Sequence, residues 1–231
     1  MGDILYRIIR LLGRPFSYRL IGARNMHYHG PAIYVANHLG SIGPIEVILS
    51  MPVRFLPWVI AEMADFRRAP DYLYDDFVHS AWRLGGRSGR VVSALVARIA
   101  VALINGIGCI PVERSAGLFD ESFGRSLALL VEGKSLLIFP EDRDGPLNPE
   151  TRMRPFLCGF TYLCRMYQER TGRQLPIVPL AVSPEEKTIA IGEPVLWGLQ
   201  GDRRQDLRKL CHQLQENVWE LYQSLRSDTR C

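Results

Sequence analysis

His38 is the side chain of this sequence that is best placed for acid–base chemistry. The short apolar run 32–36 precedes it and is typical of a buried strand that stops at Asn37. Small residues follow, and Pro44 then opens an apolar run typical of a helix with proline in its first position. A histidine between a strand end and a helix N-terminus is where α/β proteins tend to place chemistry. The alternative is a histidine that is only hydrogen-bonded in a loop.

Three further short blocks follow His38 in the sequence. They are Gly108-Cys-Ile-Pro-Val-Glu-Arg114, Phe139-Pro-Glu141 and Ile177-Val-Pro-Leu-Ala181. Together with Asn37-His38, they resemble the four motif blocks of the glycerolipid and lysophospholipid acyltransferase family. The resemblance covers about residues 22–194, and four blocks in one order are a more specific signal than a single motif.

The resemblance implies transfer of a fatty acyl group from acyl-CoA or acyl carrier protein to a hydroxyl of a lysophospholipid or a glycerol phosphate-type acceptor. His38 would act as the general base, without an acyl-enzyme intermediate. Arg114 would hold the phosphate of the acceptor, because a guanidinium matches phosphate oxygens, unless a salt bridge to an acid such as Glu113 occupies it. Glu141 and Arg143 are the other predicted substrate-binding residues, and no cofactor or metal is implied.

Two of the blocks depart from the family pattern. Gly43 stands where the family has the aspartate that supports its histidine. Glu46 falls at the third helical position if Pro44 is the first, so its carboxylate can fold back over the helix N-terminus and reach His38. The alternative is that Glu46 only caps the helix or complements its dipole.

The third block continues as Asp142-Arg143-Asp144-Gly145 where the family has Gly-Thr-Arg. Arg143 takes the place of the family arginine, but the two flanking aspartates weaken its attraction for an anion. With Gly43, this change favours a second interpretation, a catalytically weakened protein that binds lipid or a partner. A hydrolase that uses water as acceptor is a third interpretation, for which the sequence has no dedicated feature.

The composition favours one globular α/β domain. The 231 residues are 47% hydrophobic and 23% charged, and the net charge is +4. All but three of the 28 basic residues are arginines, and their excess near the N-terminus suggests an anionic surface such as phospholipid headgroups, with no nucleic acid partner. Five cysteines without a CxxC pair predict free thiols in a reducing compartment and no metal site.

The apolar patterns predict a single-domain α/β sandwich in which helices flank a central mixed sheet, as the resemblance also implies. Residues 1–18 form a basic amphipathic segment expected to lie on a membrane, or else an ordinary surface helix packed on the domain. Residues 19–231 form the domain, with an insertion at 66–89. The run 91–105 predicts a buried helix, which Arg98 and its length make a poor membrane span. The expected location is cytoplasmic, peripheral on the inner face of the membrane.

Overall fold

A computed structural model of the chain describes residues 2–27, 29–38, 43–79, 85–113, 121–197 and 203–227. The chain is organised in two compact units. The first contains Met1–Ile9 and Leu56–Gly117, and the second contains Arg10–Phe55 and Leu118–Cys231. The boundary predicted at residue 18 stays a prediction.

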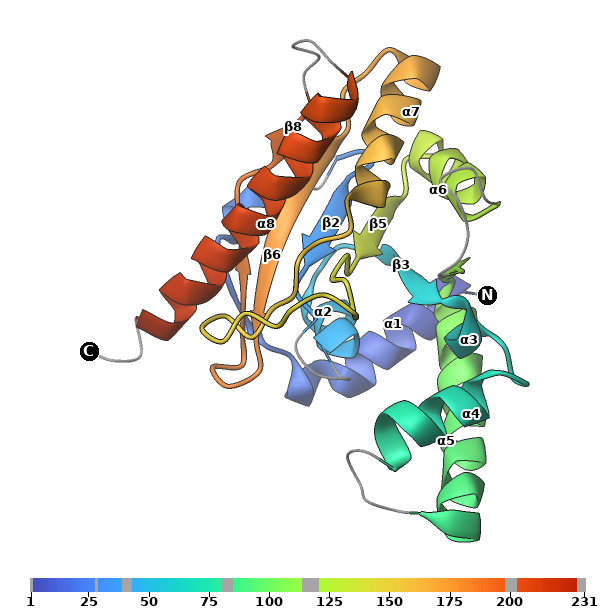
Figure 1. Ribbon diagram of the computed structural model, residues 1–231. Coiled ribbons are helices and arrows are strands. Elements are labelled where there is room, and N and C mark those ends of the chain that lie inside the picture. The colour runs from blue at the N-terminus through green and yellow to red at the C-terminus, as the bar shows by residue number, and fades with distance from the viewer. Residues whose placement is uncertain are drawn as a thin grey trace. The chain divides into compact units, whose positions relative to one another are not determined.

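The second unit is built on a mixed sheet (Figure 1). Within this unit the strand order is β1-β7-β6-β2-β5, and β8 pairs with Pro176 and Ile177 of β6. Neighbouring strands are parallel except for β7 and β8, which run antiparallel to β6. The strands are β1 (Arg19–Ile21), β2 (Ile33–Ala36), β5 (Ser135–Ile138), β6 (Pro176–Ser183), β7 (Thr188–Ile191) and β8 (Val195–Leu196). The predicted mixed sheet is confirmed.

The central strands β2, β5 and β6 are buried along their whole length, as their unbroken apolar runs predict. Tyr34 of β2 is level with Leu137 of β5 on one side and with Val178 of β6 on the other. Because β2 and β5 are parallel and in this register, their carboxyl ends lie at the same edge. The residues that follow them, from Asn37 and from Phe139, are therefore neighbours.

Helices cover this sheet. The long helix α8 packs against β6 and β7, and α6 packs against β5 and α7 (Figure 1). In α8 the apolar residues at helical spacing, Leu207, Leu210, Leu214 and Val218, are all buried. The helical elements of the unit are α2 (Gly43–Ser50), α6 (Glu121–Val131), α7 (Tyr162–Thr171), α8 (Arg203–Ser227) and the short turns η1 (Arg14–Phe16), η2 (Ala23–Asn25) and η4 (Cys158–Thr161).

The first unit is mainly helical. It contains the parallel pair β3 (Phe55–Ile60, apart from its first residue) and β4 (Ile110–Val112). Its helical elements are α3 (Ala61–Ala64), α4 (Ala69–Leu73), the π-helical η3 (Tyr74–Val78) and α5 (Gly86–Ile107), and α1 (Gly2–Gly13) begins in it. The described part of the predicted insertion is therefore mainly helical, at residues 69–78 and 86–89. Residues 80–84 of the insertion lie outside the described residues.

The run 91–105 forms the predicted helix, as part of α5, but the prediction that this helix is buried is wrong. Ser93, Ala97 and Val101 are buried, whereas Val91 and Leu95 are 69% and 63% exposed. A nearly uniform apolar composition gives no pattern that distinguishes the buried side of a helix from its exposed side.

The prediction of five free thiols is wrong for one pair, because Cys158 and Cys211 form a disulfide. They are 53 residues apart in sequence, but the packing of α8 on η4 brings their Cα atoms to 5.4 Å. Cys109 and Cys164 are free and buried. Cys231 lies outside the described residues.

Candidate active site

The end of β2 is fixed by the side chain of Asn37. This residue is fully buried, and its amide nitrogen donates to the carbonyl oxygen of Val182 at 3.0 Å. The backbone N–H of Val182 donates in return to the Asn37 side-chain oxygen at 2.7 Å. The amide thereby imitates one more residue of strand pairing with β6. It defines where the strand stops and where His38 begins.

His38 lies at the carboxyl end of the parallel strands with its side chain exposed. Its ring meets the Phe139 ring edge to face, with the centroids 5.4 Å apart and an interplanar angle of 80°. Its backbone N–H donates to Oε1 of Glu141 at 2.6 Å. The first and third motif blocks are therefore in direct contact, and the imidazole remains accessible to a substrate.

Glu141 connects two segments of backbone. Its Oε1 accepts the N–H of His38, and its Oε2 accepts the N–H of Arg154 at 3.0 Å. Burial raises the pKa of the Glu141 carboxyl above its usual value, although both N–H donors and the nearby positive charges of His38 and Arg154 oppose that rise. Both carboxylate oxygens are thus engaged by the protein itself. Glu141 holds the backbone of His38 just after β2, and its predicted contact with substrate stays a prediction.

The loop 142–155 after Glu141 is closed at its base by backbone pairing. Asp142 N–H donates to the Pro155 carbonyl at 2.8 Å, and Leu157 N–H donates to the Pro140 carbonyl at 2.7 Å. The guanidinium of Arg154 donates to the carbonyl of Gly145 within the loop. Sequence reasoning missed Arg154, whose backbone contact with Glu141 has no signature in residue type or spacing.

Asp142, one of the two aspartates that flank Arg143, organises a turn. Its Oδ1 accepts the backbone N–H of Asp144 at 3.1 Å, and its carbonyl oxygen accepts the backbone N–H of Gly145. Arg143 itself is exposed on this loop. It lies two residues after Glu141, so the third block supplies an acid that contacts the His38 backbone and an exposed cation on the loop that follows.

Glu46 is engaged by a residue other than His38. The hydroxyl of Tyr18 donates to Oε1 of Glu46, and the backbone N–H of Tyr18 donates to Ser50 Oγ at 2.8 Å. Burial raises the pKa of Tyr18, and its hydrogen bond to Glu46 and the charge of that carboxylate raise it further. Oε2 of Glu46 is buried without a hydrogen-bond partner. Among the described residues, no hydrogen bond or ion pair joins Glu46 to His38.

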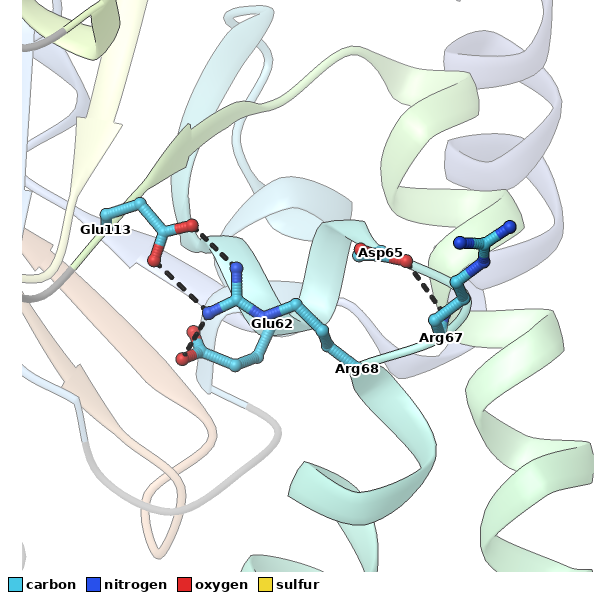
Figure 2. Close-up of polar contacts among 5 residues, drawn as sticks. All are labelled: Glu62, Asp65, Arg67, Arg68 and Glu113. Carbon is cyan, nitrogen blue, oxygen red and sulfur yellow. Dashed lines mark hydrogen bonds and ion pairs between the residues drawn. The ribbon is translucent and has the colours of Figure 1, made fainter.

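Arg114 lies outside the described residues, but its neighbour Glu113 does not. The Arg68 guanidinium donates to both oxygens of Glu113, at 2.6 and 3.2 Å, and to Glu62 at 2.8 Å (Figure 2). Beside this cluster, Arg67 N–H donates to Asp65 Oδ1 at 2.7 Å. The carboxylate that the sequence offered as a partner for Arg114 is therefore bound by Arg68.

The fourth motif block lines a groove that is separate from the residues around His38. A groove of about 680 Å³ lies beside α8, and Pro179 of the fourth block lines it with Gly192, Asn217 and Leu221 among others. The residues that line this groove do not include His38 or Glu141. Within the described residues, no group of three or more His, Cys, Asp or Glu side chains is arranged to hold a metal ion.

A comparison of the sequence with family models and with curated proteins finds no match. Among solved structures, the fold matches the crystal structure of the 1-acyl-sn-glycerophosphate (LPA) acyltransferase, PlsC, from Thermotoga maritima. The TM-score is 0.58 at 14% sequence identity, and the match covers 97% of this chain and 81% of that chain. This protein therefore shares the α/β fold of that acyltransferase over nearly its whole length.

Proposed function

We propose that this protein is an O-acyltransferase that moves a fatty acyl group from acyl-CoA or acyl carrier protein to a hydroxyl of a lysophospholipid or glycerol phosphate-type acceptor. The observation that carries the proposal is the exposed imidazole of His38 at the carboxyl end of β2. Glu141 fixes the position of this residue by accepting its backbone N–H. The fold shared with an LPA acyltransferase supports the same class of reaction.

In the proposed reaction, the neutral imidazole of His38 takes the proton of the acceptor hydroxyl as its oxygen attacks the thioester carbonyl. The tetrahedral oxyanion then collapses, the carbon–sulfur bond breaks, and the imidazolium returns the proton to the leaving thiolate. The products are the acylated acceptor and the free thiol, so no covalent intermediate with the protein is required.

The other site residues have supporting roles in this proposal. Glu141 positions His38 rather than touching the reacting atoms, because its oxygens accept backbone donors. Arg143 is exposed near that carboxylate, and we assign it and Arg114 to the acceptor phosphate. Glu46 remains the candidate carboxylate for the imidazolium, because its Oε2 has no hydrogen-bond partner while its Oε1 accepts the Tyr18 hydroxyl.

The acceptor would reach the protein from a membrane. In and just after α1, large apolar side chains are exposed to solvent: Ile4, Ile8, Leu11, Leu12 and Phe16. The exposed residues alternate with Arg7, Arg10 and Arg14, a pattern that suits an interface of acyl chains and phosphates. The proposal places the protein peripherally, on the inner face of the membrane.

The second candidate function is lipid or partner binding without turnover. It is favoured by the engagement of Glu46 with Tyr18, since Gly43 offers no carboxylate in its place. An assay of thiol release from acyl-CoA with a panel of lysophospholipids separates the two. The acyltransferase proposal expects acceptor-dependent release that falls by roughly 10²- to 10⁴-fold in His38→Ala.

The matched control for that assay is His212→Ala, because His212 is also exposed but lies on α8. It is expected to release thiol at the wild-type rate. No release from any of the three proteins, together with retained lysophospholipid binding, would support the second function. Release that does not require an acceptor would indicate hydrolysis instead.

A further inference from the structure

Helix α5 exposes a row of large apolar side chains along most of its length. Val91, Leu95, Ile99 and Leu103 are spaced by four residues and are 69%, 63%, 57% and 42% exposed. Residues four apart lie on one side of an α-helix, so the four side chains form a continuous stripe. We call this row the α5 stripe. A contiguous apolar surface of this kind marks an interaction site.

The opposite side of α5 is the side that packs within its unit. Ser93 Oγ donates to the Pro70 carbonyl at 2.5 Å, and Ala97 and Val101 are buried in a cluster with Ala69. These positions are offset by two residues from the α5 stripe, which is about 200° around the helix. The helix is thus fully supplied with packing partners on one side, and the stripe is not needed to hold the unit together.

The charges of α5 indicate what covers the stripe. Its charged residues are Arg87, Arg90 and Arg98, all exposed, and the helix contains no aspartate or glutamate. Arg98 follows Leu95 by three residues and so lies beside it on the helix surface, where a long arginine side chain can lie along the apolar row and place its guanidinium at a phosphate. An exposed apolar row on a helix whose own charged residues are all cations matches the interface of an anionic phospholipid bilayer.

The length, burial and packing of α5 together indicate whether the helix lies on a membrane or crosses it. The helix has 22 residues and is long and apolar enough for a span, yet only 22% of its most apolar window is buried. A core helix of a soluble protein would be mostly buried. A spanning helix would not have one side packed on α4 and Arg98 in its middle. If α5 lies parallel to the membrane plane, its packed side faces the protein and its exposed apolar side faces the lipid.

Helix α1 meets α5 in the same unit. A Cβ added at Gly106 of α5 would clash with the side chain of Leu5, so the absence of a side chain there lets the two helices approach closely. Ile4 and Ile8, which flank Leu5 on α1, are exposed. Residues 1–9, the first part of the segment predicted to lie on a membrane, therefore belong to the same compact unit as the α5 stripe.

We propose that the α5 stripe is a membrane-docking surface that inserts Val91, Leu95, Ile99 and Leu103 into the acyl boundary of an anionic bilayer, with Arg87 and Arg98 at the phosphates. A second copy of the chain is the competing occupant, but pairing two such helices would bring arginines together without a compensating acid. The inference deepens the proposed function by naming how the protein meets a lipid surface. It does not depend on catalysis, because binding is measured without turnover.

A fluorescent label tests the contact directly. An environment-sensitive dye is attached to Leu95→Cys in the full chain with Cys231→Ser, since the other cysteines are buried or form the disulfide. Vesicles made of equal parts phosphatidylcholine and phosphatidylglycerol are then added. We expect a blue shift and a higher intensity at position 95, and no change when the dye is at Val131→Cys, an exposed position of α6. An unchanged spectrum at position 95 would overturn the proposal.

Vesicle sedimentation supplies the second test. The double substitution Leu95→Gln and Ile99→Gln should lower the partition coefficient on the order of tenfold, with Val131→Gln as the control. Arg98→Gln should lower it about fivefold on the anionic vesicles and leave it unchanged on pure phosphatidylcholine. Thermal melting checks that the variants remain folded. A double variant that binds vesicles like the wild type but loses a dimer in size-exclusion chromatography would assign the stripe to a second copy and overturn the proposal.

Discussion

At the scale of single residues, Glu141 is the side chain on which the geometry around His38 depends most. A carboxylate has acceptors on both oxygens, and here both are used by backbone N–H groups, of His38 and Arg154. The residue is also half-buried, so a lost acceptor is not replaced freely by water. Glu141 therefore both stabilises the folded protein and positions His38.

Glu141→Gln is expected to lower the free energy of unfolding by about 1–3 kcal/mol, because the amide nitrogen cannot accept the N–H that it would face. Urea denaturation measures the change. Glu132→Gln is the matched control, since Glu132 is exposed at the end of α6, and it should be near neutral. Equal stabilities of the two variants would show that the two backbone contacts of Glu141 contribute nothing.

The raised pKa of Glu141 predicts a pH dependence of stability. Between its ordinary value of 4.5 and its raised value, the folded protein holds the proton more tightly than the unfolded chain does. The contribution of Glu141 to the free energy of unfolding therefore falls as the pH rises through that window and is constant above it. The difference between wild type and Glu141→Gln, measured in urea at a series of pH values, should show this slope. A difference that grows with pH in the same range would contradict it.

Tyr18 and Glu46 form a pair whose energetic coupling can be measured. Tyr18→Phe leaves the Glu46 carboxylate without its hydroxyl donor and is expected to cost about 1–2 kcal/mol of stability, whereas Tyr162→Phe serves as a control. In a double-mutant cycle with Glu46→Gln, the two effects should not add. Additive effects would mean that the pair is not coupled, and Glu46 would then be free to serve His38.

At the scale of elements, the strands that build the site follow directly from the sequence. The runs 33–36, 135–138 and 176–183 are short and consist largely of apolar residues, which is typical of strands buried on both faces. Because two of them are parallel neighbours, the residues after them meet at one edge. The contact between His38 and Glu141 is therefore a consequence of the strand pattern and of the order of the motif blocks.

Other contacts had no local signal in the sequence. The donor to Glu46 is Tyr18, 28 positions away and outside any helical spacing. The disulfide joins Cys158 to Cys211, and no pattern of cysteine spacing specifies such a pair. The exposure of one side of α5 was also missed, because periodicity cannot identify the buried side when nearly every residue is apolar.

The disulfide between η4 and α8 should stabilise the second unit. It closes a loop of 53 residues, for which the chain-entropy relation gives about 4 kcal/mol, with roughly 2–4 kcal/mol typical in practice. Reductant is expected to lower the urea midpoint of the wild type and to leave Cys211→Ser unchanged. A wild-type midpoint insensitive to reductant would contradict this. Counting free thiols in protein isolated without reductant also tests the reducing location predicted from the sequence.

At the scale of the whole molecule, two features must work together for the proposed reaction. One unit carries His38 and Glu141 at a sheet edge, and the other carries the α5 stripe. A lysophospholipid acceptor resides in a bilayer, so an enzyme that uses it must remain on that surface. A variant of the α5 stripe that loses vesicle binding should therefore lose activity toward vesicle-borne acceptor and retain it toward a soluble glycerol phosphate.

The central claim is that His38 is the base for acyl transfer. The most direct measurement is the initial rate of thiol release from acyl-CoA on vesicles that contain a lysophospholipid, for the wild type, His38→Ala and His212→Ala. We predict acceptor-dependent release by the wild type and His212→Ala, and a loss of at least about a hundredfold in His38→Ala. Equal release by His38→Ala and the wild type would contradict the account.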